Sequence, residues 1–239
     1  TPHNIVITID GSNDPAEITG GLATVQEDVG VIAGNLLEAS GTLTITDVDA
    51  DEDSFVAIVN GTGTGGYGTL NLGTDGVWTY VADNSQPAIQ ELGLGDSLTD
   101  TFAVSALDGT PHNIVITIDG SNDPAEITGG LATVQEDVGV IAGNLLEASG
   151  ILTITDVDAD EDSFVAIVNG TGTGGYGLLN LATVGTWTYA ADNTQTAIQD
   201  LGNGDTLTDT FTVSAADGTT HNVVITINGS NDPAIIGGV

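Results

Sequence analysis

The sequence contains no lysine and no arginine, whereas it contains 34 aspartate and glutamate residues, so its formal net charge is −34. No side-chain salt bridge can therefore form except through the three histidines. Two carboxylates about 4 Å apart repel each other by about 1 kcal/mol in water, and by about 4 kcal/mol at an effective dielectric constant near 20. A fold that gathers these acids requires cations, either as salt or as bound divalent ions. Nucleic acids and anionic membranes are poor partners for such a surface.

Cysteine is also absent, which excludes disulfide bonds and thiolate metal sites. A secreted domain without disulfides needs another stabilising element, and a bound metal is the obvious candidate. We find no signal peptide and no apolar run long enough to span a membrane, so we expect no membrane insertion.

What the sequence does contain is an internal repeat, because the segment that begins at Thr1 begins again at Thr110. Residues 1–41 and 110–150 are identical, and up to Gly68 only Thr42 differs from its counterpart, Ile151. A unit of this length lies in the ordinary size range of a domain. We therefore expect two domains with separate cores.

Short runs of alternating apolar residues, separated by Gly, Thr, Asn and Asp, predict strands with tight turns. The run Phe55–Val59 is apolar throughout, so we expect it in the centre of a sheet. A short helix is predicted with Asn84 as its cap, Pro87 in its first turn and Gly93 at its end. The strands predicted in the first copy are Glu17–Gln26 with a break at Gly20-Gly21, Gly41–Thr46, Phe55–Val59, Tyr67–Leu72, Val77–Ala82, Leu98–Ser105 and Asn113–Ile118.

About seven short strands per copy, without alternating βαβ units, predict an all-β fold of two tandem Greek-key β-sandwich domains, each with one short helix. Trp78 and Tyr80 alternate inward on one strand, as do Phe102 and Val104 on another, and we assign all four to the core. An aromatic pair can also bind sugar, but each copy has a single Trp, which lies mid-strand beside apolar neighbours.

The last strand of each copy begins with a His-Asn pair, at His112 and His221, and the same pair occurs at His3 in a leading segment. We interpret these histidines as exposed edge residues rather than metal ligands. Residues 1–11 lack a sandwich of their own, so we expect them to stay extended or to lie on a neighbouring sheet edge. We divide the chain into 1–14 (the last strand and linker of a preceding repeat), 15–120 (repeat 1), 121–123 (linker), 124–230 (repeat 2) and 231–239 (start of the next linker).

Strand direction in an immunoglobulin-like sandwich predicts where the acids gather. The second strand returns to the N-terminal end, so the acidic loop Asp47–Asp53 and the final hairpin at Asp108 both lie at that end. Glu27 and Asp28 end the first strand at the C-terminal end, with Asp100 nearby. Asp100 shares strand parity with a core residue, and an inward acid needs a metal or a strong hydrogen-bond donor.

The carboxylates therefore converge on the junctions between successive modules. Oxygen-only, highly charged ligand sets suit Ca²⁺ better than Zn²⁺ or Cu²⁺, and Mg²⁺ prefers fewer protein ligands. The acidic loop is not an EF-hand, since Glu52 and Ile58 stand where that loop needs Gly and Glu. Solvated loop acids on a salt-adapted protein are the alternative interpretation. The candidate calcium ligands are Asp10, Asn13, Asp14, Glu27, Asp28, Asp47, Asp49, Asp51, Asp53, Asp100, Asp108, Asp119, Asn122, Asp123, Glu136, Asp137, Asp156, Asp158, Asp160, Asp162, Asp209 and Asp217.

An ordered set of motifs covers the whole unit and recurs in both copies. The motifs are Tyr67-Gly68-Thr69-Leu70, Gly76-Val77-Trp78-Thr79-Tyr80, Leu98-Thr99-Asp100-Thr101-Phe102, Asp108-Gly109, Ile114-Val115-Ile116-Thr117-Ile118 and Gly120-Ser121-Asn122-Asp123-Pro124. Together they resemble the VCBS repeat, one of the cadherin-like and immunoglobulin-like modules of giant bacterial RTX-type adhesins.

This resemblance implies a calcium-binding extender that is secreted to the bacterial cell surface. Its partners would be the neighbouring repeats of the same long chain, while other domains would bind the distal cell-surface, glycan or ice ligand. The connector Asp119–Pro124 is similar to the linker motif of cadherins, Asp156 and Asp158 match the cadherin Asp-x-Asp element, and Glu27 resembles the glutamate near the end of the first cadherin strand. Asn228 departs from Asp119 in the last connector, which implies a weaker site there.

Two other function classes remain. The first is an adhesive module that itself binds glycan, ice or another cell surface, or self-associates; Thr99 and Thr101 lie on the outer face of one strand, but we expect no regular array of such residues. The second is an enzyme, which we reject. The acids lie in connectors and loop ends rather than around a pocket, and no nucleophile motif is present.

Overall fold

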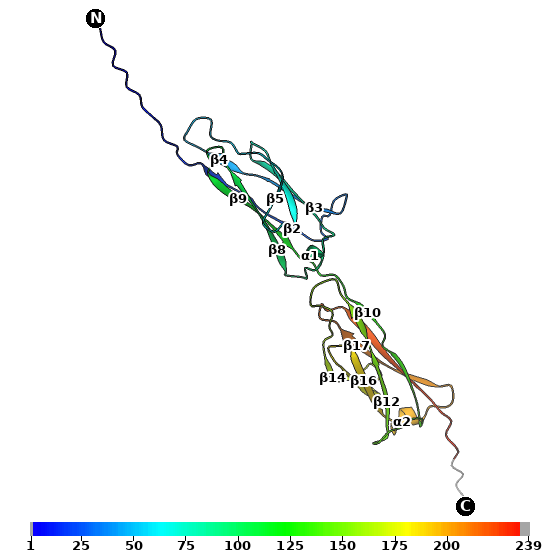
Figure 1. Cartoon of the computed structure of the whole chain (residues 1–239). Coiled ribbons are helices and arrows are strands. Elements are labelled where there is room, and N and C mark those ends of the chain that lie inside the picture. Colours follow the sequence, from blue (N-terminus) through cyan, green and yellow to red (C-terminus); the bar gives the residue numbers. More distant parts are fainter. Residues whose placement is uncertain (1, 235–239) are drawn as a thin grey trace, which may run out of the picture. The chain divides into compact units, whose positions relative to one another are not determined.

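The computed structural model describes residues 2–234. The chain consists of two compact units, unit 1 with residues 1–121 and unit 2 with residues 122–239. The regular secondary structure of each unit consists of short β-strands and one short helix, so the predicted fold class is confirmed (Figure 1). Unit 1 contains β1 (Glu17–Thr19), β2 (Leu22–Gln26), β3 (Leu36–Thr42), β4 (Thr44–Thr46), β5 (Ile58–Thr62), β6 (Gly68–Leu72), β7 (Val77–Asp83), α1 (Pro87–Gln90), β8 (Ser97–Ser105) and β9 (Pro111–Asp119). Unit 2 contains β10 (Glu126–Thr128), β11 (Leu131–Gln135), β12 (Leu145–Ile151), β13 (Thr153–Thr155), β14 (Ile167–Thr171), β15 (Gly177–Leu181), β16 (Thr186–Asp192), α2 (Thr196–Gln199), β17 (Thr206–Ser214) and β18 (Thr220–Asn228).

Each unit pairs its strands in the same three sheets. In unit 1 these are β1-β4, β2-β9-β8 and β3-β7-β6-β5, and in unit 2 they are β10-β13, β11-β18-β17 and β12-β16-β15-β14. The pairing of β2 with β9 is parallel, from Leu22 opposite Val115 to Gln26 opposite Asp119. Parallel pairing makes both strands end at the same end of the unit, and the backbone N–H of Glu27 donates to the carbonyl of Asp119 at 2.9 Å. The topology thus places the acidic turn at Glu27 and Asp28 beside Asp119, where the connector to the next unit begins.

The core lies between the three-stranded and four-stranded sheets, and the predicted core residues are confirmed. Trp78, Tyr80, Phe102 and Val104 are all buried. The rings of Tyr80 and Phe102 meet edge to face, with centroids 5.7 Å apart. Gly41 lies across from Trp78, where an added Cβ would come within 2.6 Å of the indole ring, so the core admits only glycine there.

The expectation of a central strand at Phe55–Val59 is wrong. Phe55 is buried, but its backbone forms only an isolated bridge to Ala106. The strand itself, β5, begins at Ile58 and is an edge strand with a register shift between Ile58 and Gly61. Val59 is 79% exposed, because a bulged edge strand presents one side to solvent. Apolar character was therefore a poor guide to position in the sheet.

Two further local predictions need correction. β3 spans Leu36–Thr42, so the strand predicted from Gly41 missed most of it. The short helix has Pro87 in its first turn as predicted, but Gln86 occupies the N-cap position and the C-cap is Glu91, before Gly93. Asn84 does not cap the helix and instead bonds to Asp28.

The interpretation of His112 as an exposed edge residue needs one correction, because the residue is half-buried. It pairs with Val104 of β8 and lies before the stretch of β9 that pairs with β2, and its Nε2 atom lies 3.0 Å from the carbonyl oxygen of Gly20. His221 makes the equivalent contact with Gly129 at 3.0 Å. His3 lies in the exposed leading segment.

A single row of threonines crosses the outer face of the three-stranded sheet, and the rows on either side of it contain other residues. Thr24 lies directly opposite Thr117, which lies directly opposite Thr99. Thr133, Thr226 and Thr208 repeat the row in unit 2. Parity along single strands could not reveal the row because its members come from three strands. Separately, neither helix found within residues 2–234 has the length and apolar character that crossing a membrane requires.

Candidate metal centre

The N-terminal end of unit 1 carries a group of three half-buried acids in the loop after β4. Carboxylate oxygens of Asp47, Asp49 and Glu52 lie within 4.8 Å of one another. The loop folds back on itself because Asp47 Oδ1 accepts the N–H of Asp49 at 2.9 Å, and because Asp51 adopts a left-handed conformation with φ of 70°. The turn thereby brings Asp47, Asp49 and Glu52 together on one side of the loop.

The incoming connector is fastened to this loop and to the hairpin between β8 and β9. The backbone N–H of Asp14 donates to Asp49 Oδ2 at 2.7 Å. The N–H of Ala16 donates to Asp108 Oδ2 at 3.3 Å, and the Asn13 amide lies 3.5 Å from the same oxygen. The acidic loop, the final hairpin and the connector thus meet at one end of the unit, as strand direction predicted.

Unit 2 repeats these two fastenings. The N–H of Asp123 donates to Asp158 Oδ2 at 2.8 Å, and the N–H of Ala125 donates to Asp217 Oδ2 at 3.1 Å. Asp156 Oδ1 accepts the N–H of Asp158 at 3.0 Å, as Asp47 does for Asp49. The geometry of this end is therefore a property of the repeat.

The electrostatics of this end differ between its acids. Desolvation, together with the charges of Asp49, Asp47 and Asp108, raises the pKa of Glu52. Hydrogen bonds from the Thr110 hydroxyl and backbone lower the pKa of Asp108. Asp47 Oδ2 and Glu52 Oε2 are buried and have no hydrogen-bond partner among residues 2–234. These oxygens receive no proton donor from the described chain, so a bound cation would compensate them.

The C-terminal end of unit 2 carries a second group, in which oxygens of Glu136, Asp137 and Asp232 lie within 4.8 Å of one another. Glu136 is fully buried immediately after β11. Its Oε2 atom accepts the N–H of Ser230 at 3.1 Å, whereas Oε1 is buried without a hydrogen bond within residues 2–234. A buried carboxylate oxygen without a donor is strongly unfavourable unless a cation compensates it.

Two neutral amides hold Asp137 in this group. Asn193 Nδ2 donates to Asp137 Oδ1 at 2.7 Å, and Asn193 Oδ1 accepts the Asp137 N–H at 3.3 Å. Gln199 Nε2 donates to the same Oδ1 at 3.3 Å. The hydrogen bonds from Asn193 and Gln199 lower the pKa of Asp137, so its carboxylate stays ionised.

Asp100 does not join either group. Its two oxygens accept four backbone N–H bonds of 3.0 to 3.2 Å, from a glycine-rich loop that closes over the carboxylate. Asp209 is held in the same way at 2.9 to 3.2 Å. Of the two partners that the sequence left open for this inward acid, the structure provides the hydrogen-bond donor. The donating residues are Gly65, Gly66, Tyr67 and Gly68 in unit 1, and Gly174, Gly175, Tyr176 and Gly177 in unit 2.

Several other predicted ligands lie outside the two groups that we describe. Asp51, Asp53, Asp160 and Asp162 are exposed on the acidic loops, and Asp10 is exposed in the leading segment. Asp119 is half-buried at the end of β9.

Two grouped acids were not among the predicted ligands. Glu52 lies in the acidic loop among the predicted ligands, so its position in the sequence was sufficient to identify it as a candidate. Asp232 is the repeat counterpart of Asp123, so the period alone would have identified it.

Both groups consist of oxygen ligands, and the sequence has no cysteine to add a thiolate. Such sets suit a hard divalent cation, which Ca²⁺ represents best when many carboxylates are present. Each group offers three carboxylates, and backbone carbonyls and water would complete six to eight ligands. The residues present therefore fit calcium at both ends of a unit.

Among solved structures, the chain is similar to PcdhgB3 EC1-4, with 15% sequence identity and a TM-score of 0.45, over 92% of this chain and 50% of that chain. It is also similar to the protocadherin gammaB7 EC3-6 cis-dimer structure, with 13% identity and a TM-score of 0.46, over 90% of this chain and 48% of that chain. The titin I-band fragment I67-I69 has 9% identity and a TM-score of 0.35, over 91% of this chain and 66% of that chain. The chain thus spans about half the length of these two protocadherin chains.

A comparison with curated proteins gives no match. The sequence model of the bacterial cadherin-like domain matches residues 13–120 and again residues 122–229. The two matches together cover most of the chain, and their boundaries coincide with those of the repeat to within a few residues. The chain therefore belongs to the bacterial cadherin-like domain family, of which it carries two tandem copies.

Proposed function

We propose that this chain is a calcium-binding structural extender of a large secreted bacterial surface adhesin, of the VCBS and RTX type. Calcium stiffens the junctions between successive units and so projects a distal region that binds the adhesion target. The observation that carries this proposal is Glu136, a fully buried acid with one oxygen that receives no hydrogen bond within residues 2–234. The sequence has no lysine or arginine to neutralise such a group, so the compensating charge is an ion.

Repetition explains why the ends of the units matter. The acids that follow β2 lie beside the start of the outgoing connector, because the N–H of Glu27 donates to the carbonyl of Asp119. At the other end of the connector, the N–H of Asp123 donates to Asp158 in the acidic loop of unit 2. Each group alone supplies three carboxylates, fewer than the six to eight oxygens that calcium takes. We propose that ions are shared across each connector. The proposed ligands for the connector within this chain are Glu27, Asp28, Asp119, Asn122, Asp123, Asp156, Asp158, Asp160, Asp162 and Asp217, and the preceding connector uses Asp10, Asn13, Asp14, Asp47, Asp49, Asp51, Asp53 and Asp108.

The surface charge supports an extracellular location and limits the set of partners. With a formal charge of −34, the chain repels nucleic acid and anionic lipid, whereas calcium is abundant outside cells. The partners that we propose are the neighbouring repeats of the same chain. Near-identical units suit this role because repetition adds length.

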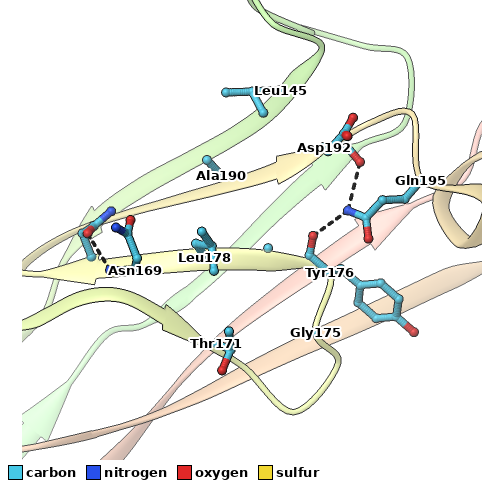
Figure 2. Close-up of a pocket in the computed structure, with 11 residues that line it drawn as sticks. Leu145, Asn169, Thr171, Gly175, Tyr176, Leu178, Ala190, Asp192 and Gln195 are labelled. Atoms are coloured by element: carbon cyan, nitrogen blue, oxygen red, sulfur yellow. Dashed lines mark hydrogen bonds between the residues drawn. The ribbon is translucent and has the colours of Figure 1, made fainter.

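The lining of one groove in unit 2 favours a structural role over catalysis. It occupies about 430 Å³ on the outer face of the four-stranded sheet (Figure 2). Gln195 is held by the carbonyls of Tyr176 and Asp192, at 2.7 and 3.0 Å. Asp192 is the one carboxylate among the lining residues, and Thr194 already donates to it at 2.9 Å. The groove thus lacks the paired acids that hydrolysis of a glycoside requires.

The same groove favours a second candidate function, binding of a neutral glycan by unit 2. Leu178 and Ala190 lie opposite each other on β15 and β16, and Asn169 and Asn180 lie beside them. Apolar side chains among amide groups suit a sugar ring. The test is a glycan array with the two-unit chain and with the variant Leu178→Thr plus Ala190→Val, which restores the residues of unit 1. Binding by the native chain that this variant loses would support the candidate, and absence of binding would eliminate it.

The calcium proposal is tested by thermal unfolding of the two-unit chain in high sodium chloride, with calcium, with magnesium or with a chelator. We expect calcium to raise the melting temperature and chelation to lower it, while magnesium has a smaller effect. Small-angle scattering should show a longer and narrower distance distribution in calcium. A melting curve that chelation leaves unchanged at high salt would overturn the proposal and leave salt adaptation as the role of the acids.

A further inference from the structure

The acid after each buried glutamate is held by an asparagine that comes from a distant part of its unit. In unit 2, Asn193 is only 6% exposed and makes a reciprocal pair of hydrogen bonds with Asp137. In unit 1, Asn84 is 2% exposed and makes the same pair with Asp28, at 2.7 Å to Oδ1 and 3.3 Å from the backbone N–H. Asparagines buried to this degree are uncommon without a defined structural task.

A glutamine at the end of the short helix supplies a second donor to the same atom. Gln90 Nε2 lies 3.4 Å from Asp28 Oδ1, and Gln199 Nε2 lies 3.3 Å from Asp137 Oδ1. Both amides thus bond Oδ1, so the acid retains Oδ2 for another ligand. In unit 2, Asp137 belongs to the acidic group with Glu136 and Asp232.

The backbone conformation at both acids is one that aspartate tolerates. Asp28 and Asp137 adopt left-handed φ values of 56° and 57°, which are unfavourable for residues other than glycine, asparagine and aspartate. Asn84 and Asn193 hold both the backbone and the side chain of these residues. The helix does not use Asn84, because Gln86 occupies its N-cap position without a side-chain cap.

The choice of amides has a chemical reason. An arginine or lysine would also hold the carboxylate, but its positive charge would oppose a nearby cation. Neutral amides orient one oxygen while leaving the full negative charge available. Both amides occur in both units, although the adjacent Ser85, Pro87 and Glu91 differ from their counterparts.

We propose that Asn84 with Gln90, and Asn193 with Gln199, are positioning residues for calcium that orient Asp28 and Asp137 from behind. This inference rests on the proposed function. Groups that orient metal ligands through hydrogen bonds commonly contribute about 10-fold to 100-fold to metal affinity.

The test measures calcium affinity by isothermal titration calorimetry on the full two-unit chain, together with the melting temperature in chelator. We expect Asn84→Ala to weaken calcium binding about 10-fold or more, and Gln90→Ala to weaken it by less, about 3-fold to 10-fold. Gln90 is half-buried at the helix end, so its variant keeps the test informative if Asn84→Ala unfolds.

Gln86→Ala is the matched control. Gln86 lies beside the same helix and donates to the carbonyls of Tyr67 and Asp83, at 2.7 and 2.9 Å, without touching a grouped acid. We expect it to lower the melting temperature in chelator and to leave calcium affinity unchanged. Asn84→Ala should also have no further effect on affinity when Asp28 is already alanine, because the two residues act through one carboxylate.

The outcomes separate this inference from the function on which it rests. A native chain that binds no calcium overturns both. A native chain that binds calcium, with Asn84→Ala and Gln90→Ala variants that bind equally well, overturns the positioning role alone. An equal loss of affinity in Gln86→Ala would assign the effect to general destabilisation and would likewise overturn it.

Discussion

Glu136 Oε2 accepts the backbone N–H of Ser230 at 3.1 Å, which joins the end of β11 to a connector residue 94 positions later in the chain. The bond fixes one oxygen of a fully buried carboxylate and leaves the other, Oε1, without a hydrogen bond within residues 2–234. The hydrogen bond from Ser230 therefore holds the Glu136 side chain in place but does not pair its second oxygen. Substitutions that change only the charge should reveal the ion.

Glu136→Gln keeps the size of the side chain and an acceptor for Ser230 while it removes the negative charge. We expect the calcium-free chain to become more stable by about 1 kcal/mol, because one carboxylate repulsion is lost. We expect calcium affinity at this end of unit 2 to fall at least about 10-fold, since a charged ligand is lost. Calorimetry with and without chelator measures both effects. Glu147→Gln, an exposed position on β12, is the control and should change neither.

Asp209→Asn should destabilise unit 2 regardless of calcium. The carboxylate accepts four backbone N–H bonds, and an asparagine would direct its NH₂ group at two of those donors. We expect a loss of about 3 kcal/mol, as is usual when charge-assisted hydrogen bonds are removed and buried donors are left unpaired. A two-transition melt of the chain measures it, and Asp100→Asn should shift the other transition by a similar amount. Rescue by calcium would contradict the structural role.

Glu52→Gln tests the repulsion within the acidic loop. The pKa of Glu52 is raised in the folded state, so its ionised form opposes folding, and the opposition decreases as the pH falls from neutral toward about 4, the ordinary glutamate range. The variant should therefore have a higher melting temperature than the native chain at pH 7 in chelator, and the difference should diminish as the pH falls. Calcium affinity should decrease about 10-fold. Glu38→Gln, exposed on β3, is the matched control.

Asp108 and Asp217 should show the opposite pH dependence. Thr110 donors lower the pKa of Asp108, while Thr219 and Ala125 donors lower that of Asp217 against the effect of burial. The stabilisation from these acids is present above the ordinary aspartate range and is lost as the pH falls through their lowered pKa values. Asp108→Asn and Asp217→Asn should therefore lower the melting temperature at pH 7 and have less effect below about pH 3. Equal effects at both pH values would contradict this account.

Asn228→Asp tests the difference between the two connectors. Asn228 stands where the first copy has Asp119, at the end of the last strand, and its carbonyl accepts the N–H of Glu136 at 2.9 Å. The substitution restores the acid without altering that backbone bond. We expect calcium to bind several-fold more tightly at the end of unit 2, and the reciprocal Asp119→Asn to weaken binding at the first connector. Calorimetric titration of both variants checks the pair, and unchanged affinities would exclude this position as a ligand.

Some features of this protein follow from the sequence alone because they depend on local order or on composition. The repeat, the all-β class and the inward alternation of Trp78 and Tyr80 are of this kind, since strand parity is a property of consecutive residues. The gathering of acids at the ends of the units also follows, because strand direction reverses with each turn. The absence of basic residues indicates that any grouped carboxylates require cations.

Only the tertiary structure decided which partner each polar side chain finds. Asp100 is bonded by a loop 32 to 35 residues earlier, and Asn84 reaches an acid 56 residues away instead of capping its helix. The edge position of β5, and its register shift around Asn60 with a φ of 50°, likewise became visible only in the packed sheet. These outcomes depend on the direction in which a backbone N–H or an amide points once the sheets have packed. The spacing of residues in the sequence does not predict that direction, because turns and strands that are distant along the chain determine the direction together.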